Sequence, residues 1–258
     1  MATGSITIKE TPLVLYALRR ADDALILGHR LSEWCGHAPM LEEDMALANT
    51  ALDLIGQARE LYSHAARVEG ADNDEDRLAY LRDVRQYRNL LLVEQPNGDF
   101  ARTMMRQFLF SAFADPYWRA MIGSADETLA AIAAKSEKES AYHLCHASEW
   151  IVRLGDGTEE SHRRAQEAAD DLWAFTGEMF HCDDGDRDLI AKGIAVDPES
   201  LRGVWRSTVE GVFAAATLAI PASDWMQKGG RIGHHSEHLG HLLTELQYLQ
   251  RSFPGATW

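Results

Sequence analysis

Apolar residues recur every three or four positions through most of the chain, and the sustained alternation expected of strands is nearly absent. This pattern predicts an all-α protein. Thr11-Pro12 supplies an N-cap followed by proline at the first helical position. Two aspartate–glycine pairs, at 156–157 and 184–185, are predicted to lie in turns. The expected helices span about 12–34, 39–69, 75–94, 99–114, 125–154, 158–180, 198–218 and 235–252.

The helix expected at 39–69 carries two apolar stripes. The first consists of Leu41, Met45, Ala48, Leu52, Ile55 and Tyr62. The second consists of Leu47, Ala51, Leu54, Ala58, Leu61 and Ala65. A helix that is apolar on two faces is expected to lie between neighbours inside a bundle and not on its surface.

The helix expected at 125–154 has an apolar stripe with a polar centre. In its segment EKESAYHLCHASEW, Glu139, His143 and His146 are four and three residues apart and share one face. The stripe begins and ends apolar, so these side chains are expected to point inward, where they need partners. Carboxylates and imidazoles that converge inside a bundle hold the metals of di-iron proteins. Metal ligation and a self-satisfied hydrogen-bond network are therefore both open interpretations.

The spacing of known bundle sites tests the metal interpretation. Such sites need Glu-x-x-His on two helices, but the residue three positions before His143 is Ser140, which cannot replace a carboxylate. The motif occurs twice elsewhere, from Glu159 to His162 and from Glu178 to His181. Both matches lie near predicted helix ends among charged residues, so exposed or frayed pairs are expected there.

A second histidine cluster lies in GHHSEHLGH, residues 233–241, where His234, His238 and His241 share a face. A zinc or nickel site is one interpretation. A helix N-terminus with histidines facing solvent or an interface is the favoured one. The preceding Lys228-Gly229-Gly230-Arg231 is expected to be an exposed basic loop. The chain contains no HExxH motif, no glycine-rich phosphate loop and no Gly-x-Ser-x-Gly elbow.

Composition narrows the functional classes. The chain has 258 residues, is 46% hydrophobic, and is treated as a single helical domain over 1–258. Its net charge of −15 argues against nucleic-acid binding. No apolar run approaches the ~18 residues of a membrane span, and the N-terminus lacks the pattern of a signal peptide. Three cysteines without a CxxC pair are expected to be buried, reduced thiols in a cytoplasmic protein.

Several segments together resemble a known family. They are SEWCGHAPMLEEDMALANTALDLIGQAREL (32–61), NLLLVEQPNGDFA (89–101), KESAYHL (138–144), GIAVDP (193–198) and EHLGHLLTELQYLQRSFPGATW (237–258). They closely resemble the C-subunit family of the phenylacetyl-CoA 1,2-epoxidases, and the similarity runs over nearly the whole chain. The resemblance implies a ferritin-like helical bundle with additional C-terminal helices.

The resemblance also implies a multicomponent bacterial mono-oxygenase that uses oxygen and NADPH to epoxidise the ring of phenylacetyl-CoA. Within it, a related A subunit holds the di-iron centre and binds substrate. A separate reductase, with FAD and an iron–sulfur cluster, delivers the electrons. The C subunit is implied to be a structural partner that forms homodimers alone and mixed oligomers with the A subunit. Trp118, Trp150 and the start of the helix near residue 234 are candidate contact points.

The ligand positions of the related A subunit are transferred to this chain by resemblance. Glu33 and His143 keep a ligand type. At the other positions the ligand is replaced: the residues there are Leu54, Gln57, Ser111 (or Phe108) and Ser140. Two ligands cannot hold two irons, so no metal, cofactor or catalytic residue is expected in this chain.

The expected function is that of a non-catalytic structural subunit. In this hypothesis Glu139, His143 and His146 hold the bundle together through hydrogen bonds and ion pairs. Two alternatives remain open. One is a ferritin-like metal-binding oxidase that acts through these three residues. The other is a helical interaction module from another pathway.

Overall fold

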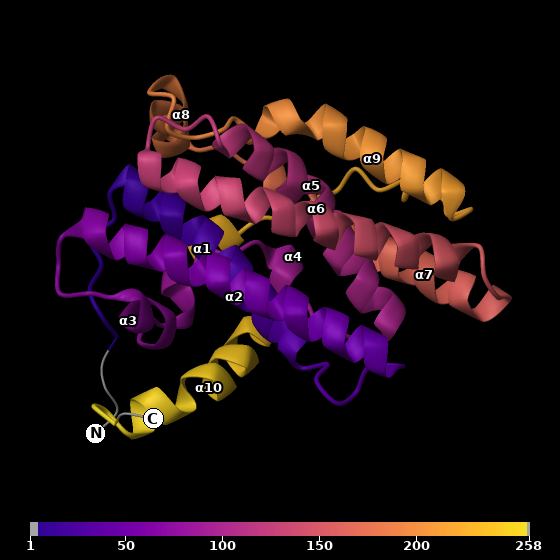
Figure 1. Ribbon diagram of the computed structural model, residues 1–258, viewed down its shortest axis with the longest axis horizontal. Coiled ribbons are helices and arrows are strands. Elements are labelled where there is room, and N and C mark those ends of the chain that lie inside the picture. The colour runs from indigo at the N-terminus through magenta and orange to yellow at the C-terminus, as the bar shows by residue number, and fades with distance from the viewer. Residues whose placement is uncertain (1–4, 257–258) are drawn as a thin grey trace.

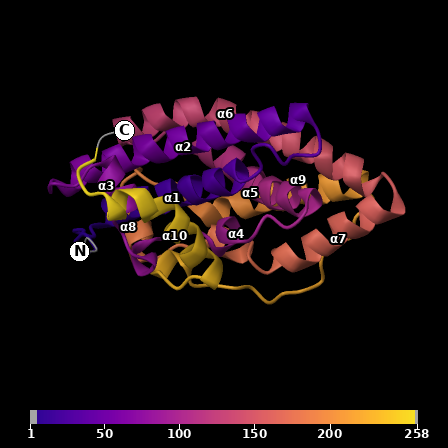
Figure 2. The ribbon, with the colours of Figure 1, turned by 90° about the horizontal axis from the view of Figure 1, so that it is seen from below.

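The computed structural model describes residues 5–256, and all regular structure in this range is helical (Figure 1). Four long helices form the body of the molecule: α1 (Pro12–Ser32), α2 (Leu41–Glu69), α5 (Phe100–Met121) and α6 (Glu127–Gly155). α1 packs along α2, α5 packs along α6, and α2 also contacts α6. Figure 2 shows α2 and α6 side by side along the top of the molecule, with α1 beneath α2. The predicted all-α bundle is confirmed.

Shorter helices surround this body. α7 (Glu159–Trp173) and α9 (Arg202–Ala215) pack against α5 and α6, and α8 (Asp184–Ala191) contacts α1. α10 (Glu237–Ser252) lies against α3 (Glu75–Tyr80) and η1 (Val84–Gln86), apart from α5 and α6 in Figure 1. The remaining short elements are α4 (Leu91–Glu94), η2 (Gly177–Phe180), η3 (Pro198–Leu201) and η4 (Gly230–Ile232).

The helix starts follow local chemistry. Thr11 Oγ1 accepts a hydrogen bond from the Val14 amide at 3.3 Å, so the predicted N-cap of α1 is confirmed. Asp99 and Asp126 cap α5 and α6 in the same way. Between α1 and α2, a Cβ placed on Gly28 would lie 3.2 Å from the Ala51 carbonyl oxygen. Glycine at this position therefore allows the two helices to cross closely.

α5 continues beyond its predicted end at 114 and passes through Pro116 to Met121. Proline within a helix costs about 3 kcal/mol because it lacks an amide proton and crowds the preceding turn. Phe113, Tyr117 and Trp118 around it are all buried. Burial of these rings outweighs the local cost, which is why the sequence pattern placed the end too early.

The continuous helix predicted for 75–94 is wrong. The segment instead forms α3, η1 and α4, separated by irregular backbone. The amides of Arg88 and Leu90 donate to the carboxylates of Asp22 and Asp23 on α1, both at 2.7 Å. These long-range bonds replace helical ones, and no local pattern encodes them.

Other element boundaries also differ from the prediction. Asp184-Gly185 opens α8 instead of forming a turn, because Asp183 caps that helix by accepting from the Asp186 amide at 2.8 Å. The helix expected at 158–180 ends at Trp173 and is followed by η2. The helix expected at 198–218 starts as η3 and ends at Ala215.

Two expectations about burial are wrong. The second apolar stripe of α2 is buried, whereas in the first only Tyr62 is buried and Leu41, Met45 and Leu52 are 72%, 59% and 66% exposed. α2 therefore lies at the surface of the bundle. The free cysteines are not buried either: Cys35 and Cys145 are exposed, and the third, at 182, is partly so.

Candidate functional site

The polar face of α6 meets α2 in paired contacts. Glu139 Oε2 accepts from Gln57 Nε2 at 2.9 Å, and His143 Nε2 lies 3.1 Å from Asp53 Oδ2. His146 Nε2 lies 2.9 Å from Glu43 Oε2. All three residues singled out in the sequence thus face α2, and each has its own partner there.

Two more contacts extend this row. Lys135 Nζ lies 3.1 Å from Glu60 Oε1, and His64 Nε2 lies 3.0 Å from Asp126 Oδ2. The five contacts follow in order because α2 and α6 run antiparallel. We refer to them as the α2–α6 ladder: Glu43–His146, Asp53–His143, Gln57–Glu139, Glu60–Lys135 and His64–Asp126.

Burial controls the protonation of the ladder. It lowers the pKa of His143 and of His64, although the carboxylates of Asp53 and Asp126 work against the shift. It raises the pKa of Glu139, which the hydrogen bond from Gln57 opposes. Burial therefore favours the neutral form of the His143 and His64 imidazoles. No group of three or more histidine, cysteine or acidic side chains within residues 5–256 is arranged to hold a metal.

Most of the positions transferred from the di-iron relative lie inside the bundle. Leu54, Gln57, Ser111, Ser140 and His143 are all buried. Ser111 Oγ accepts from Gln107 Nε2 at 3.0 Å, a contact within α5. A hydrocarbon, an amide and two hydroxyls occupy these positions, and only one imidazole remains.

Glu33 is not brought to the other positions. It caps the end of α1, is exposed, and accepts from Arg30 Nη1 and Asn97 Nδ2, each at 2.8 Å. Gln57 lies instead at the level of Arg20, Asp23 and Ala24, with which it lines a cavity of about 20 Å³. That is room for about one water molecule. The residues at these positions do not fit a di-iron centre, because Leu54, Gln57, Ser111 and Ser140 are neither carboxylates nor imidazoles.

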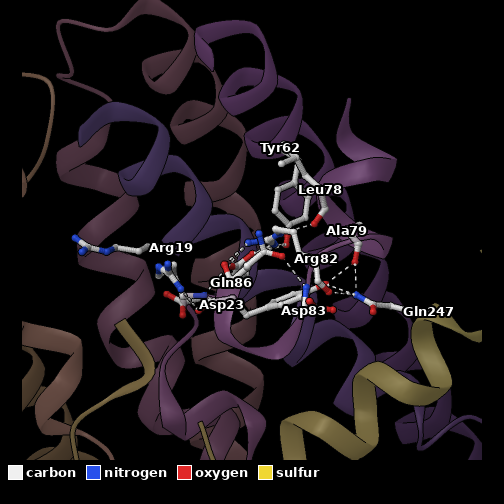
Figure 3. A network of polar contacts seen from close by, with 12 residues as sticks. Arg19, Asp23, Tyr62, Leu78, Ala79, Arg82, Asp83, Gln86 and Gln247 are labelled. Atoms are coloured by element: carbon white, nitrogen blue, oxygen red, sulfur yellow. Dashed lines mark hydrogen bonds and ion pairs between the residues drawn. The ribbon is translucent and has the colours of Figure 1, made fainter. Parts of the chain in front are cut away.

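The sequence reasoning missed a buried charged network beneath α1 (Figure 3). Arg82 and Asp22 form an ion pair in which neither side chain is exposed. Asp22 also accepts from Tyr62 Oη at 2.5 Å. Figure 3 shows Gln247 of α10 reaching the same region, where its Nε2 donates to the Arg82 carbonyl oxygen at 3.0 Å. The network thereby links α1, α2, the 82–90 segment and α10.

Asp23, the neighbour of Asp22, binds a different segment. Its Oδ2 accepts from Arg231 Nη2 at 2.7 Å, and both side chains are buried. Burial raises the pKa of Asp23, and the charges of Arg231 and Arg20 oppose that rise. The pair fixes η4 to α1. One sequence signal could have found it, namely two adjacent aspartates within the otherwise apolar run ADDALIL of α1.

The loop expected at 228–231 is not an exposed basic loop. Gly229, Gly230 and Arg231 are buried, and only Lys228 is exposed. The exposed or frayed state expected for Glu178 is also wrong. Its carboxylate is buried and accepts from the backbone amides of residues 91, 229 and 231 at 3.0–3.1 Å. A single buried carboxylate therefore holds the start of α4 and the start of η4 together. In the other Glu-x-x-His match, from Glu159 to His162, Glu159 is exposed, as expected.

The second histidine cluster does not converge. His234 lies before α10 and is exposed, as is His241, while His238 is half-buried. The buried ring is that of His235, whose Nδ1 lies 2.8 Å from Glu94 Oε2 and whose Nε2 lies 3.0 Å from the Tyr87 carbonyl oxygen.

One candidate contact point from the sequence is also buried. Trp118 is 5% exposed within the core. Trp150 is half-buried and packs edge-on against Phe100 at a ring-centroid distance of 4.9 Å. Neither tryptophan ring is freely exposed on the surface as a contact point for a partner.

Together, the fold and these contacts define an all-α bundle whose interior polar groups pair with one another. Comparison with known proteins makes the assignment specific. The chain belongs to the phenylacetic acid catabolic protein family, whose model matches residues 2–258. This places it in phenylacetate catabolism and confirms the ferritin-like class expected from the resemblance.

A curated relative extends the comparison. The chain is 50% identical over 246 residues to the C subunit of 1,2-phenylacetyl-CoA epoxidase from Escherichia coli (strain K12). The match covers 95% of this chain and 99% of that protein. Within residues 5–256, none of the helices combines the length and the apolar character needed to cross a membrane.

Proposed function

We propose that this chain is a non-catalytic structural subunit of a phenylacetyl-CoA ring 1,2-epoxidase complex. The name of the E. coli relative supports membership of such a complex. One observation within the chain carries the structural role: Leu54, Gln57 and Ser140 stand where ligands are expected, and all three are buried. A buried leucine offers no donor to a metal.

This replacement of ligands gives the subunits of the complex different roles. The A subunit of the complex holds the di-iron centre and the substrate, and a reductase with FAD and an iron–sulfur cluster supplies electrons. This chain carries none of these groups. It provides a rigid bundle for the A subunit, works in the cytoplasm, and forms homodimers when its partner is absent.

The ladder supports the structural role over the alternative of a metal-binding oxidase. Glu139, His143 and His146 each contact a separate residue of α2. An oxidase that acts through these residues would have to break three hydrogen bonds to gather them around one ion. Hydrogen bonds to a charged partner are worth about 1.5–3 kcal/mol each, so retaining them favours the bundle.

Co-expression with the A subunit tests the proposal. We expect a stable complex on size-exclusion chromatography, with iron in the A subunit and none in this chain purified alone. Metal analysis after expression with added iron and manganese tests the oxidase alternative. Near-stoichiometric metal that is lost in His143→Ala would overturn the structural assignment, as would failure to associate with the A subunit.

A further inference from the structure

α2 presents an unpaired apolar stripe to solvent. Leu41, Met45 and Leu52 are among the most exposed large hydrophobic residues of the chain, and Ala48 and Ile55 between and after them are half-buried. We refer to these five residues as the α2 seam. The second apolar stripe of α2 is buried in the core. The exposed side chains of the α2 seam therefore contribute little to holding this chain together.

The spacing of the α2 seam is that of a helix-packing surface. Its members are separated by four, three, four and three residues. This is the heptad spacing at which apolar side chains fit between those of a second helix that crosses at a shallow angle. At 1.5 Å per residue, the α2 seam is about 21 Å long, or about two heptads. An exposed surface of this kind marks a docking site for another helix.

Length and charge restrict what can dock. An isolated helix of only about two heptads is marginal in water, so the incoming helix has to belong to a folded partner. Residues 41–59 contain four acids and one base, and the Nε of that base, Arg59, lies 3.5 Å from Glu75 Oε1. On the α6 side, the Asp53 side chain is 38% exposed, and the Glu60 side chain, 43% exposed, is paired with Lys135. A second copy would bring acidic flanks together, whereas a partner helix with basic flanks would match them.

We propose that the α2 seam docks a helix of the partner subunit, with basic residues on that helix facing the acidic flanks. This proposal rests on the proposed function, in which the partner is the A subunit. α2 carries both the α2 seam and one partner of each contact in the α2–α6 ladder. The ladder therefore holds the docking surface rigid, which lowers the entropic cost of association.

The double variant M45E/L52E tests the proposal. Both side chains are exposed, so the fold is expected to be retained, and far-UV circular dichroism checks this. Affinity for the separately purified A subunit is measured by biolayer interferometry. Loss of a central apolar anchor typically costs a factor of about ten, so we expect affinity to fall about a hundredfold. Higher salt is expected to weaken the wild-type complex as well.

V204E serves as the matched control. Val204 is 55% exposed on α9, which Figure 1 shows on the other side of the bundle from α2. Its affinity is expected to stay within about twofold of wild type. Wild-type affinity in M45E/L52E would overturn the seam proposal and leave the proposed function intact. Loss of self-association with unchanged A-subunit binding would assign the α2 seam to a second copy and equally overturn it. If the wild-type chain itself fails to bind the A subunit, the proposed function fails.

A second measurement does not depend on a destabilising substitution. A photo-crosslinking amino acid at position 52 is expected to capture the A subunit, whereas the same group at position 204 is not. Equal crosslinking from both positions would contradict the proposal.

Discussion

Arg82 Nη1 lies 3.1 Å from Asp22 Oδ2, and neither side chain is reached by solvent. The two residues come from α1 and from the irregular segment that follows α3. Asp22 also accepts from the Arg88 amide at 2.7 Å. One carboxylate thus neutralises a buried guanidinium and fixes the path of the chain that passes beneath the bundle.

Asp22→Ala is expected to be strongly destabilising. It leaves the Arg82 charge buried without a counter-ion, and removing one partner of such a pair costs about 3–5 kcal/mol. Urea unfolding followed by circular dichroism measures the loss. The control is Glu167→Ala, which breaks an exposed pair with Arg163 and is expected to leave the midpoint unchanged. A change below about 1 kcal/mol for Asp22→Ala would show that water or rearrangement replaces the pair.

Gly230→Ala is expected to destabilise the chain through steric overlap. A Cβ at this position would lie 2.1 Å from the Asn89 carbonyl oxygen and 3.1 Å from Glu178 Oε2. Overpacking of this kind costs about 1–3 kcal/mol. Gly211→Ala is the matched control, because a Cβ there meets nothing within 4 Å inside α9. It is expected to stabilise the helix by about 0.5–1 kcal/mol. The thermal unfolding midpoints of Gly230→Ala and Gly211→Ala should therefore shift in opposite directions. A shift of both midpoints in the same direction would contradict this explanation.

The stability of the ladder is expected to fall as the pH drops from about 7 towards 5. Burial lowers the pKa of His143 in the folded chain. As the pH falls through the unfolded value near 6.5, the unfolded state takes up the proton first and is favoured. The contribution of this one residue cannot exceed about 1.4 kcal/mol per pH unit. Urea titrations at several pH values should show a shallower decline in His143→Asn.

His37→Asn controls for that pH experiment, because His37 is exposed near the start of α2. It is expected to leave the pH dependence of unfolding as in wild type. If the unfolding free energy of His143→Asn falls with decreasing pH as steeply as that of the wild type, the pH dependence arises from other groups.

Restoring ligand types should not restore a metal site. The triple variant L54E/Q57H/S140E supplies two of the missing carboxylates and the imidazole, but Ser111 still offers no carboxylate and Glu33 still caps the far end of α1. Positions 54 and 140 are buried, so the new carboxylates would lose their hydration there, and we expect a loss of several kcal/mol in stability. Iron content is expected to stay far below one ion per chain. Stoichiometric iron bound by a folded triple variant would show that α1 can shift to complete the site.

Much of the secondary structure could be predicted from the sequence. Thr11-Pro12 starts α1 as local chemistry requires. The side chains of Glu139, His143 and His146 were expected to need partners, because polar groups at the centre of an apolar stripe cannot be left bare. The structure supplies one acceptor or donor on α2 for each.

Local periodicity could not decide which surface of α2 is buried. Its two stripes are both apolar in sequence, yet Leu47 is 1% exposed and Leu52 is 66% exposed. The choice depends on where α1 and α6 pack, and that is set by residues distant in sequence. The exposed stripe is consequently where we place the partner.

The sequence by itself determined the helical class and several helix starts. Only the tertiary structure decided that Asp22 and Asp23 are buried ion-pair partners and that Arg231 lies inside. The partners in these pairs are 60 and 208 positions apart. Helical periodicity reports neighbours three or four residues away, whereas the free energy of a buried charge depends on the group that the fold places against it.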